Sequence, residues 1–283
     1  MDVSALQSFI VSALREDIGD GDHSTLSSIP PDAQGEAVLK IKEAGVLAGM
    51  DVARAVFLHL DSRAQFHPHK QDGDAMQPGE TAFVVHASVH AILQGERLVL
   101  NCMQRMSGIA TLTRTYTYLL QGYHTRLLDT RKTTPNFRLL EKEAVRIGGG
   151  VNHRFGLYDM IMLKDNHIDY CGGIELAIER AVDYVARVKP GLAIEVETRS
   201  LADVRRVLAV GKVQRIMLDN FTPSDVQTAV TLIGGRMETE ASGGINHHNL
   251  QAYAATGVDY VSSGAVIHQA RSLDLSLKAV IHR

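Results

Sequence analysis

The chain of 283 residues is long enough for one barrel-sized domain and a smaller one, with a sizeable hydrophobic core. Its formal net charge of −3, with 22% charged residues, argues against general binding to nucleic acids or acidic membranes, and no run approaches the ~20 apolar residues that cross a bilayer. The two cysteines, Cys102 and Cys171, have no CxxC spacing, and the amphipathic start carries acids instead of a basic leader, so we expect a reducing, cytoplasmic compartment.

The first third of the chain has the pattern of an α+β domain. Apolar residues at helical spacing predict an opening helix over residues 4–15, which the glycines of GDGDHST end. Strand-like runs and one helical run follow, in this order: strands at 36–42 and 45–49, a helix at 51–60, and strands at 64–69 and 81–88. From 89 to 120 the pattern predicts one or two long helices, interrupted at Ser107-Gly108, and we place the domain boundary within this stretch.

The rest of the chain alternates short apolar strands with helices. The predicted strands are 125–129, 160–165, 192–197, 213–219, 235–242 and 258–264. The predicted helices are 174–188, 200–210, 224–233 and 246–256. Strands at this spacing, separated by helices, form a parallel sheet covered by helices, and six such units close most naturally as an α/β barrel.

Polar residues follow nearly every predicted strand of this half, where barrels of this kind hold their active sites. Cations come first (Arg131, Lys132, His153, Arg154, Lys164), carboxylates next (Glu195, Glu197, Asp219), and Gly/Ser turns last (242–244, 263–264). Clustered Arg and Lys suit carboxylates, paired carboxylates suit a metal ion or sugar hydroxyls, and glycine turns suit a phosphate. The order predicts a ligand with three chemically different parts.

Each of these features also has a purely structural explanation. Arg131-Lys132 alone would fit a solvated turn, since Pro135 and two threonines follow the pair. The run 148–150 would fit a connector or a helix C-cap, and Glu197 or Asp219 would fit an N-cap. Four histidines without HExxH spacing are interpreted as surface residues: His67, His69, His247 and His248.

Residues 129–168, DTRKTTPNFRLLEKEAVRIGGGVNHRFGLYDMIMLKDNHI, closely resemble the central segment of quinolinate phosphoribosyltransferases, also called nicotinate-nucleotide pyrophosphorylases (carboxylating). The resemblance continues through EDIGDGDHST near the start and through residues 95–111, 194–204, 216–223, 240–246 and 256–270. It therefore covers nearly the whole chain, with long and specific motifs.

The resemblance implies the type II phosphoribosyltransferase architecture, which is an incomplete α/β barrel with an N-terminal α+β domain. The implied limits are 1–110 for the N-terminal domain, 111–270 for the barrel, and 271–283 for a C-terminal helix that packs back on the N-terminal domain. The implied reaction joins quinolinate and phosphoribosyl pyrophosphate (PRPP), with Mg²⁺, to give nicotinate mononucleotide, pyrophosphate and CO2 in NAD synthesis. Family members form homodimers or larger assemblies of dimers, with active sites shared between subunits.

The same resemblance implies roles for individual residues. The residues around quinolinate would be Arg131, His153, Arg154 and Lys164, with Arg97 lent by the neighbouring subunit. Lys132 would act in catalysis on the pyrophosphate side, and Glu197 and Asp219 would lie near Mg²⁺ and the ribose hydroxyls. The phosphates of PRPP would lie against Lys132, Ser242, Gly243, Gly244, Ser263, Gly264 and His268; at Ser263, VSSGAV departs slightly from the family's usual turn.

Two other classes of function remain open at this point. A barrel lyase or aldolase would use Lys164 to form a Schiff base, since a lysine at a strand end permits it. A non-catalytic anion-binding protein would use the same scaffold. Five cations near one site favour a polyanionic ligand over the first alternative, and the carboxylates Glu197 and Asp219 speak against the second, since a simple anion receptor gains nothing from them.

Overall fold

The computed structural model describes residues 1–280 and divides the chain into two compact units. The first unit contains Met1–Arg114, Thr133–Gly149 and the C-terminal stretch from Ile267, and the second contains Thr115–Lys132 and Gly150–Val266. These units differ from the domain limits expected from the sequence. The segment 133–149 and the stretch from Ile267 interrupt or follow the barrel region in sequence, yet they belong to the first unit.

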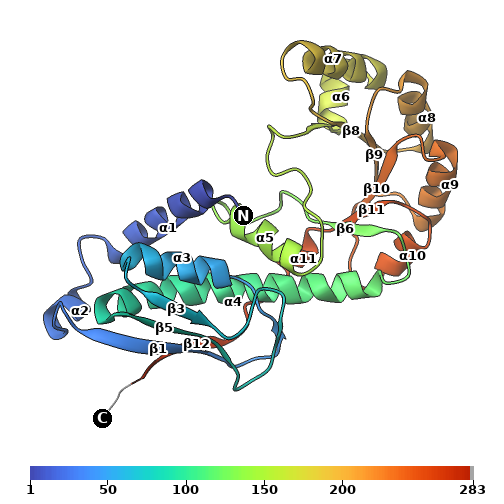
Figure 1. Cartoon of the computed structure of the whole chain (residues 1–283). Coiled ribbons are helices and arrows are strands. Elements are labelled where there is room, and N and C mark those ends of the chain that lie inside the picture. The colour runs from blue at the N-terminus through green and yellow to red at the C-terminus, as the bar shows by residue number, and fades with distance from the viewer. Residues whose placement is uncertain (281–283) are drawn as a thin grey trace. The chain divides into compact units, whose positions relative to one another are not determined.

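The first unit is an α+β structure, as expected. Its helices are α1 (Val3–Ile18), α2 (His23–Ser28), α3 (Met50–Leu60), most of α4 (Val89–Leu119) and α5 (Arg138–Ile147). Its main sheet has the order β12 (Leu275–Val280), β1 (Gln34–Ile41), β5 (Thr81–Ser88) and β3 (Gln65–Pro68), all antiparallel (Figure 1). A separate pair joins β2 (Gly45–Val46) to β4 (Ala75–Met76).

The core of this unit forms between the main sheet and its helices. Alternate residues of β1, namely Ala37, Leu39 and Ile41, are fully buried, which is the period of a strand with one face on a core. The ring of Phe57 from α3 meets the ring of Phe83 from β5 edge-on at 6.1 Å. Buried and more exposed side chains thus alternate along β1, which has one face on the core.

The helix expected for residues 271–283 is wrong over Leu275–Val280, which form strand β12. The strand pairs with β1 from Ile41↔Leu275 to Glu36↔Val280. The physical reason is visible in the sequence, because Leu273, Leu275 and Leu277 alternate with polar residues at the period of a strand. The last three residues of the expected helix lie outside the described residues.

The interruption expected at Ser107-Gly108 is also wrong, because α4 runs unbroken from Val89 to Leu119. Position 108 requires a glycine for steric reasons, because a Cβ there would lie 1.8 Å from the backbone oxygen of Arg271. Ser107 is buried, and its hydroxyl accepts a hydrogen bond from the backbone N–H of Ala48 at 3.0 Å. The small residues therefore mark a close approach of neighbouring chain segments to one continuous helix.

The second unit is an open parallel barrel, and the expected fold class is confirmed. Its strands are β6 (Arg126–Leu128), β7 (Ile161–Leu163), β8 (Ile194–Thr198), β9 (Arg215–Asp219), β10 (Glu238–Ser242) and β11 (Tyr260–Ser262), in the order β6-β11-β10-β9-β8-β7 (Figure 1). Every neighbouring pair is parallel. Strands β6 and β7 are the two edges of the sheet, so the barrel stays incomplete.

Helices connect these strands and cover the sheet. They are α6 (Asp165–Cys171), α7 (Ile174–Arg187), α8 (Leu201–Val210), α9 (Pro223–Ile233) and α10 (Leu250–Ala254), followed by α11 (Ala265–His268) at the junction with the first unit. Side-chain caps start two of them, because Ser200 and Thr222 each accept a hydrogen bond from the backbone N–H three residues later. All five residues of β8 are buried, as expected for a strand covered on both faces.

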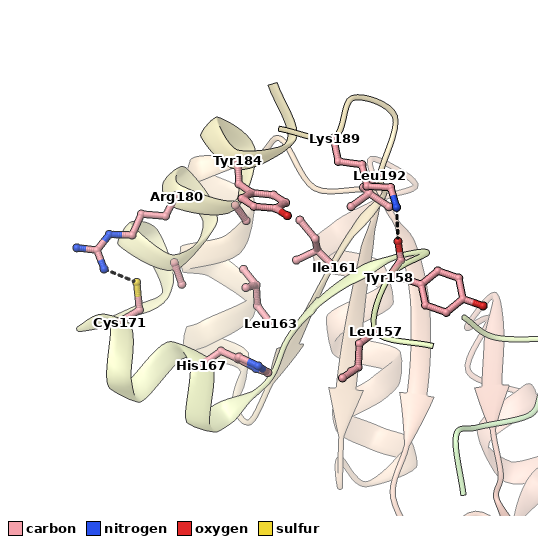
Figure 2. Close-up of a pocket in the computed structure, with 12 residues that line it drawn as sticks. Leu157, Tyr158, Ile161, Leu163, His167, Cys171, Arg180, Tyr184, Lys189 and Leu192 are labelled. Atoms are coloured by element: carbon pink, nitrogen blue, oxygen red, sulfur yellow. Dashed lines mark hydrogen bonds between the residues drawn. The ribbon is translucent and has the colours of Figure 1, made fainter. Parts of the chain in front are cut away.

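A pocket of 580 Å³ lies against the edge strand β7 (Figure 2). Its lining is mostly apolar and includes Ile161 and Leu163 of β7, Tyr184 of α7 and Leu192. It contains none of the site residues expected from the sequence.

Within residues 1–280, no helix combines the length and the apolar character that crossing a membrane requires.

The close approach at Gly108 gives a testable expectation for stability. Gly108→Ala should lower the free energy of unfolding by about 1–3 kcal/mol or more, because the new methyl group meets backbone that cannot move aside easily, despite the better helix propensity of alanine. Thermal unfolding followed by circular dichroism measures the change. The matched control is Gly95→Ala in the same helix, where the methyl group meets only side-chain atoms of Phe57 and Leu60, at 3.0 Å or more. Equal behaviour of the two variants would contradict the explanation.

Candidate active site

The polar residues expected at the strand ends lie along one edge of the second unit, which we call the rim. Hydrogen-bonded register pairs Ser262 with Leu128, Ser242 with Asp219, and Glu197 with Met217. Because all six strands run in one direction, the residues after each strand meet at this edge. The rim therefore gathers the expected groups of the second unit.

Two arginines of the rim lie close enough to influence each other. The guanidinium of Arg154 is buried, and its Nη1 donates to the backbone oxygen of Met160 at 3.1 Å. Burial and then the charge of Arg131 hold the pKa of Arg154 below its ordinary value. Arg131 and Lys132 themselves are exposed. Two guanidinium groups that disfavour each other's charge form a site that a multiply charged anion would stabilise.

Lys164 pairs with one of the expected metal-binding carboxylates. Its Nζ lies 3.3 Å from Oε2 of Glu197, with the lysine side chain 47% exposed and the glutamate side chain 10% exposed. Lys164 also precedes α6, a helix that the sequence analysis did not predict, and its backbone N–H donates to Nδ1 of His167 at 3.0 Å. The structure thus places a cation and a carboxylate together where β7 and β8 reach the rim.

Asn220 connects Asp219 to the glycine turn after β10 by hydrogen bonds. The side-chain amide of Asn220 donates to Oδ2 of Asp219 at 2.7 Å, and its backbone N–H donates to the oxygen of Ser242 at 2.8 Å. Gly243 has a φ of 98°, and a Cβ there would lie 2.2 Å from Oδ1 of Asn220. Gly244 also has a positive φ, of 63°, but a Cβ there would meet nothing within 4 Å. The turn therefore packs against Asn220 at Gly243, while Gly244 has open space beside it.

Ser263 supports this turn from inside the protein. Its hydroxyl donates to the backbone oxygen of Ile245 at 2.7 Å, and its backbone N–H donates to the oxygen of Leu128. The residue is buried, as is the following Gly264. Ser263 therefore ties the end of β11 to the turns after β10 and β6, while Ser242 remains partly exposed.

Below the rim, three ionisable side chains form what we call the buried trio: His153, Glu195 and Glu240. Nε2 of His153 lies 3.0 Å from Glu195 and 3.2 Å from Glu240, and neither glutamate side chain is exposed. The backbone N–H of Arg154 points at Nδ1 from 2.6 Å, so Nδ1 accepts and the ring proton lies on Nε2. His153 therefore faces the barrel interior and not the solvent.

The trio holds an extra proton at neutral pH. Burial disfavours a charged imidazole, but the carboxylates of Glu195 and Glu240 outweigh it and raise the pKa of His153 to about 9. Burial and the nearby Glu240 also raise the pKa of Glu195 above its ordinary value. Because the imidazole and the two carboxylates interact strongly, they titrate as one unit, and the extra proton belongs to the trio as a whole.

Asp129, at the end of β6, fixes the segment that carries His153. One carboxylate oxygen accepts from the backbone N–H of His153 at 2.8 Å, and the other accepts from the side chain of Asn152 at 2.7 Å. Asp129 is fully buried, and Val151 forms a parallel bridge with Leu128 beside it. This acid of the DTRK motif is therefore structural, and it holds the loop that ends in His153-Arg154.

Two expected site residues belong to the first unit. Arg97 is exposed on α4, and His268 is exposed at the end of α11. The four histidines interpreted as surface residues are all exposed, as predicted, and His247 stacks on His248 at 3.7 Å.

The sequence analysis missed Glu240 and Arg215 and gave no role to Asp129. It grouped Glu195 with the strand-end carboxylates, whereas the structure buries this side chain below the rim against His153. A signal was present for the glutamates. In IEVET and ETEAS, a glutamate lies in the middle of an otherwise apolar or small-residue strand, and a charge in such a strand must be buried with a partner. The identity of that partner, His153, could not be read from the strands themselves.

An open parallel barrel with clustered guanidinium groups, carboxylates and glycine turns on one rim defines a class of barrel phosphoribosyltransferases. Family models support this directly. The C-terminal domain of quinolinate phosphoribosyl transferase matches residues 109–278, and the N-terminal domain matches residues 22–107. The chain belongs to the quinolinate phosphoribosyltransferase family.

Individual relatives agree over nearly the whole chain. A probable nicotinate-nucleotide pyrophosphorylase [carboxylating] of Bacillus subtilis is 44% identical, covering 94% of this chain and 90% of its own. Quinolinate phosphoribosyltransferase [decarboxylating] 1b of Nicotiana tabacum is 42% identical, covering 96% and 82%. The crystal structure of NadC from Streptococcus pyogenes superposes with a TM-score of 0.91 at 41% identity, covering 99% of each chain.

The raised pKa of His153 predicts how stability depends on pH. The contribution of the His153 proton should be complete below pH 6.5 and should disappear as the pH rises through about 9, because the folded state holds a proton that the unfolded state releases. Between pH 6.5 and 9.5, the wild type should lose on the order of 1–3 kcal/mol of unfolding free energy relative to His153→Gln. Urea unfolding at several pH values measures this difference. Parallel pH profiles for the two proteins would rule out the retained proton.

Proposed function

We propose that the protein transfers the phosphoribosyl group of PRPP to quinolinate, with decarboxylation, and yields nicotinate mononucleotide, pyrophosphate and CO2 in NAD biosynthesis. The observation that carries the proposal is the rim, which joins paired guanidinium groups to carboxylates and a glycine turn in a chain of this family. Curated relatives that match nearly the whole chain are named quinolinate phosphoribosyltransferase [decarboxylating] and nicotinate-nucleotide pyrophosphorylase [carboxylating].

Quinolinate would bind at the cationic part of the rim. Its two ring carboxylates are adjacent, so they require cations a short distance apart, and Arg131 and Arg154 meet this requirement. Lys164 would contribute a third positive charge, while His153 would form the floor beneath the ring. Each charge-assisted hydrogen bond to a carboxylate contributes roughly 1.5–3 kcal/mol.

The ribose and pyrophosphate would lie over the carboxylates. Glu197 and Asp219 project from the adjacent strands β8 and β9, and oxygen ligands of this kind fit Mg²⁺, which usually binds one or two carboxylates together with substrate phosphates. A bound Mg²⁺ would neutralise charge on the pyrophosphate. Lys132, exposed after β6, would neutralise more of it, and the carboxylates would favour positive charge on the ribose ring.

The turn after β10 would hold the 5′-phosphate. Gly243 and Gly244 have positive φ angles, and the open side of Gly244 lets the backbone approach a ligand closely. Ser242 and Gly264 would complete this end, with Ser263 fixing the turns from behind.

The chemistry needs little beyond binding and orientation. The pyridine nitrogen is neutral and carries a free electron pair at pH 7, so it can attack the anomeric carbon without a general base, and the bond to pyrophosphate breaks as the new C–N bond forms. The ring nitrogen is then cationic. The C2–carboxylate bond can break with its electron pair left on C2, next to that charge, and C2 takes up a proton after CO2 departs.

Two further parts of the proposal concern assembly and compartment. Arg97 lies in the first unit, on an exposed face of α4, and we propose that it completes the quinolinate site of a second copy in a homodimer, or in larger assemblies of such dimers. Both cysteines are free thiols, which suits a cytoplasmic protein.

The alternative chemistry at Lys164 is not favoured. A Schiff-base lysine needs an apolar pocket or a neighbouring cation, whereas Lys164 is half exposed beside Glu197. A non-catalytic anion-binding role is not favoured either, because the curated relatives are named as enzymes.

The central test is release of labelled CO2 from quinolinate carboxyl-labelled at C2. Release should require both PRPP and Mg²⁺, and Arg131→Lys should lower kcat/KM by roughly 10- to 100-fold because a lysine cannot form a bidentate contact. Arg187→Ala serves as the control, since Arg187 pairs only with Asp183 on exposed α7 among the contacts described. Borohydride trapping of a substrate on Lys164, or CO2 release without PRPP, would overturn the proposal.

A shared active site predicts complementation between two inactive variants. Arg97→Ala and Arg131→Ala should each retain only a small fraction of wild-type activity. If dimers form with one chain of each, one of the two sites in every mixed dimer keeps both arginines, so up to about half of the wild-type activity per dimer should return. Mixed dimers isolated with two different affinity tags allow the measurement. Inactive mixed dimers would show that Arg97 does not act across subunits.

A further inference from the structure

The interior of the second unit contains an ionic column where barrels usually hold apolar layers. Below the rim lies the buried trio, with the side chain of His153 only 5% exposed. In register with Glu195 on the neighbouring strand, Arg215 places Nη1 3.3 Å from Glu240 and Nη2 2.8 Å from Glu238. The guanidinium also stacks over the ring of Tyr260 at 4.4 Å. Two fully buried carboxylates thus lie between an imidazole and a guanidinium.

Such a cluster is a poor way to stabilise a fold. Removing two carboxylates from water costs several kcal/mol each, and apolar residues of similar volume often stabilise a protein as well or better. The same face of the sheet also carries apolar side chains, since Met162, Met217 and Leu128 share the register of the glutamates and are buried. The carboxylates therefore require an explanation other than stability.

The contacts of Glu195 show where its influence is directed. Among the described residues, its carboxylate oxygens have no hydrogen-bond partner beyond the ion pair with His153. Glu240 contacts His153, Arg215 of β9 and the side chain of Ser262 of β11. The two glutamates converge on one nitrogen, Nε2 of His153, from strands on either side of β9. Their shared target is the orientation of this ring.

The orientation of His153 in turn determines where Arg154 lies. Asp129 holds the backbone N–H of His153 at 2.8 Å, and the backbone N–H of Arg154 donates to Nδ1 of the same ring at 2.6 Å. The ring is thus fixed at both nitrogens, and the second contact fixes the start of the next residue. The Arg154 guanidinium is held on the backbone oxygen of Met160 at 3.1 Å, where the charge of Arg131 acts on it.

We propose that Glu195 and Glu240 are positioning residues that fix the His153 ring and, through the adjacent Arg154, set the geometry of the dicarboxylate-binding end of the site. This inference rests on the proposed function, because it assigns that end of the rim to the pyridine dicarboxylate. Neither glutamate contacts the substrate. Their effect should fall on binding of the dicarboxylate more than on PRPP, which in the proposed function contacts Glu197, Asp219 and the turn after β10.

The test compares Glu195→Gln and Glu240→Gln with Glu238→Gln. Glu238 is the matched control, because it also pairs with Arg215 from β10 but is 49% exposed and lies outside the trio. Both trio variants should raise KM for quinolinate about tenfold or more, while KM for PRPP stays within about twofold. Glu238→Gln should change neither constant by more than about twofold. Unchanged quinolinate KM in Glu195→Gln, or the same loss in Glu238→Gln, would overturn the proposal.

A second readout does not depend on activity. In protein labelled with ¹⁵N-histidine, the ring resonances of His153, assigned with His153→Gln, should shift in Glu195→Gln and Glu240→Gln and stay in place in Glu238→Gln. Circular dichroism and thermal unfolding confirm that each variant is folded, and Glu195→Asp replaces Glu195→Gln if the latter is not. Unshifted His153 resonances in the folded trio variants would also overturn the proposal.

These measurements separate the inference from the function on which it rests. If the wild type releases no CO2 from quinolinate, the proposed function fails, while the ring resonances still report whether the glutamates hold His153. The same three side chains could instead bind a metal ion, since their ligand atoms lie within 4.8 Å of one another. Metal analysis of the purified protein tests this alternative. A stoichiometric metal ion that is present in the wild type and lost in His153→Gln would replace positioning by metal binding.

Discussion

The direction of six neighbouring strands is the constraint on which the second unit depends. Because β6 to β11 all run the same way, residues that are far apart in the chain reach one edge together, and the hydrogen-bonded register fixes their depth. Asp219 and Ser242 face each other in that register, although 22 residues separate them in sequence. No single loop could hold guanidinium groups, carboxylates and glycine turns in this arrangement. The parallel sheet does so without requiring any of these groups to stabilise the fold.

Charge inside the sheet follows a related rule. At the rim, water and substrate can compensate a charge, so Arg131 and Lys132 are exposed there. One layer lower, compensation must come from the protein, and each charged group of the buried trio faces an opposite one at 3.0–3.3 Å. Electrostatic interactions are stronger in such a low-dielectric interior, and an unpaired group there is correspondingly costly. In the interior of the sheet, charged side chains are therefore paired with one another. At the rim, the exposed Arg131 and Lys132 can bind an anion.

Much of this could be predicted from the sequence, and the exceptions have physical causes. The apolar runs and the helical patterns between them located all six barrel strands, because short strands buried on both faces leave a strong local signal. The sequence also predicted that strand ends would carry the site. Two errors arose where a local pattern had a distant cause: Gly108 was interpreted as an interruption when it admits the backbone of Arg271, and Leu275–Val280 were expected to be helical although they pair with β1. Helix α6 was not predicted, because DNHIDYC has too few apolar residues to show a helical period. The roles of Asp129 and Glu240 depend on contacts with a segment that lies elsewhere in the chain, which no local pattern reveals.

The position of β12 has a consequence for the order in which the chain can fold during synthesis. The second unit is complete once Val266 has been synthesised, whereas the four-stranded sheet of the first unit lacks a strand until β12, which follows the second unit in the chain, has been made. Until then β1 offers an open edge with unpaired backbone groups, which is a template for pairing with another nascent chain. Strand β12 thus closes the sheet only after the whole second unit has been made, so the unit that starts earlier in the chain is completed later.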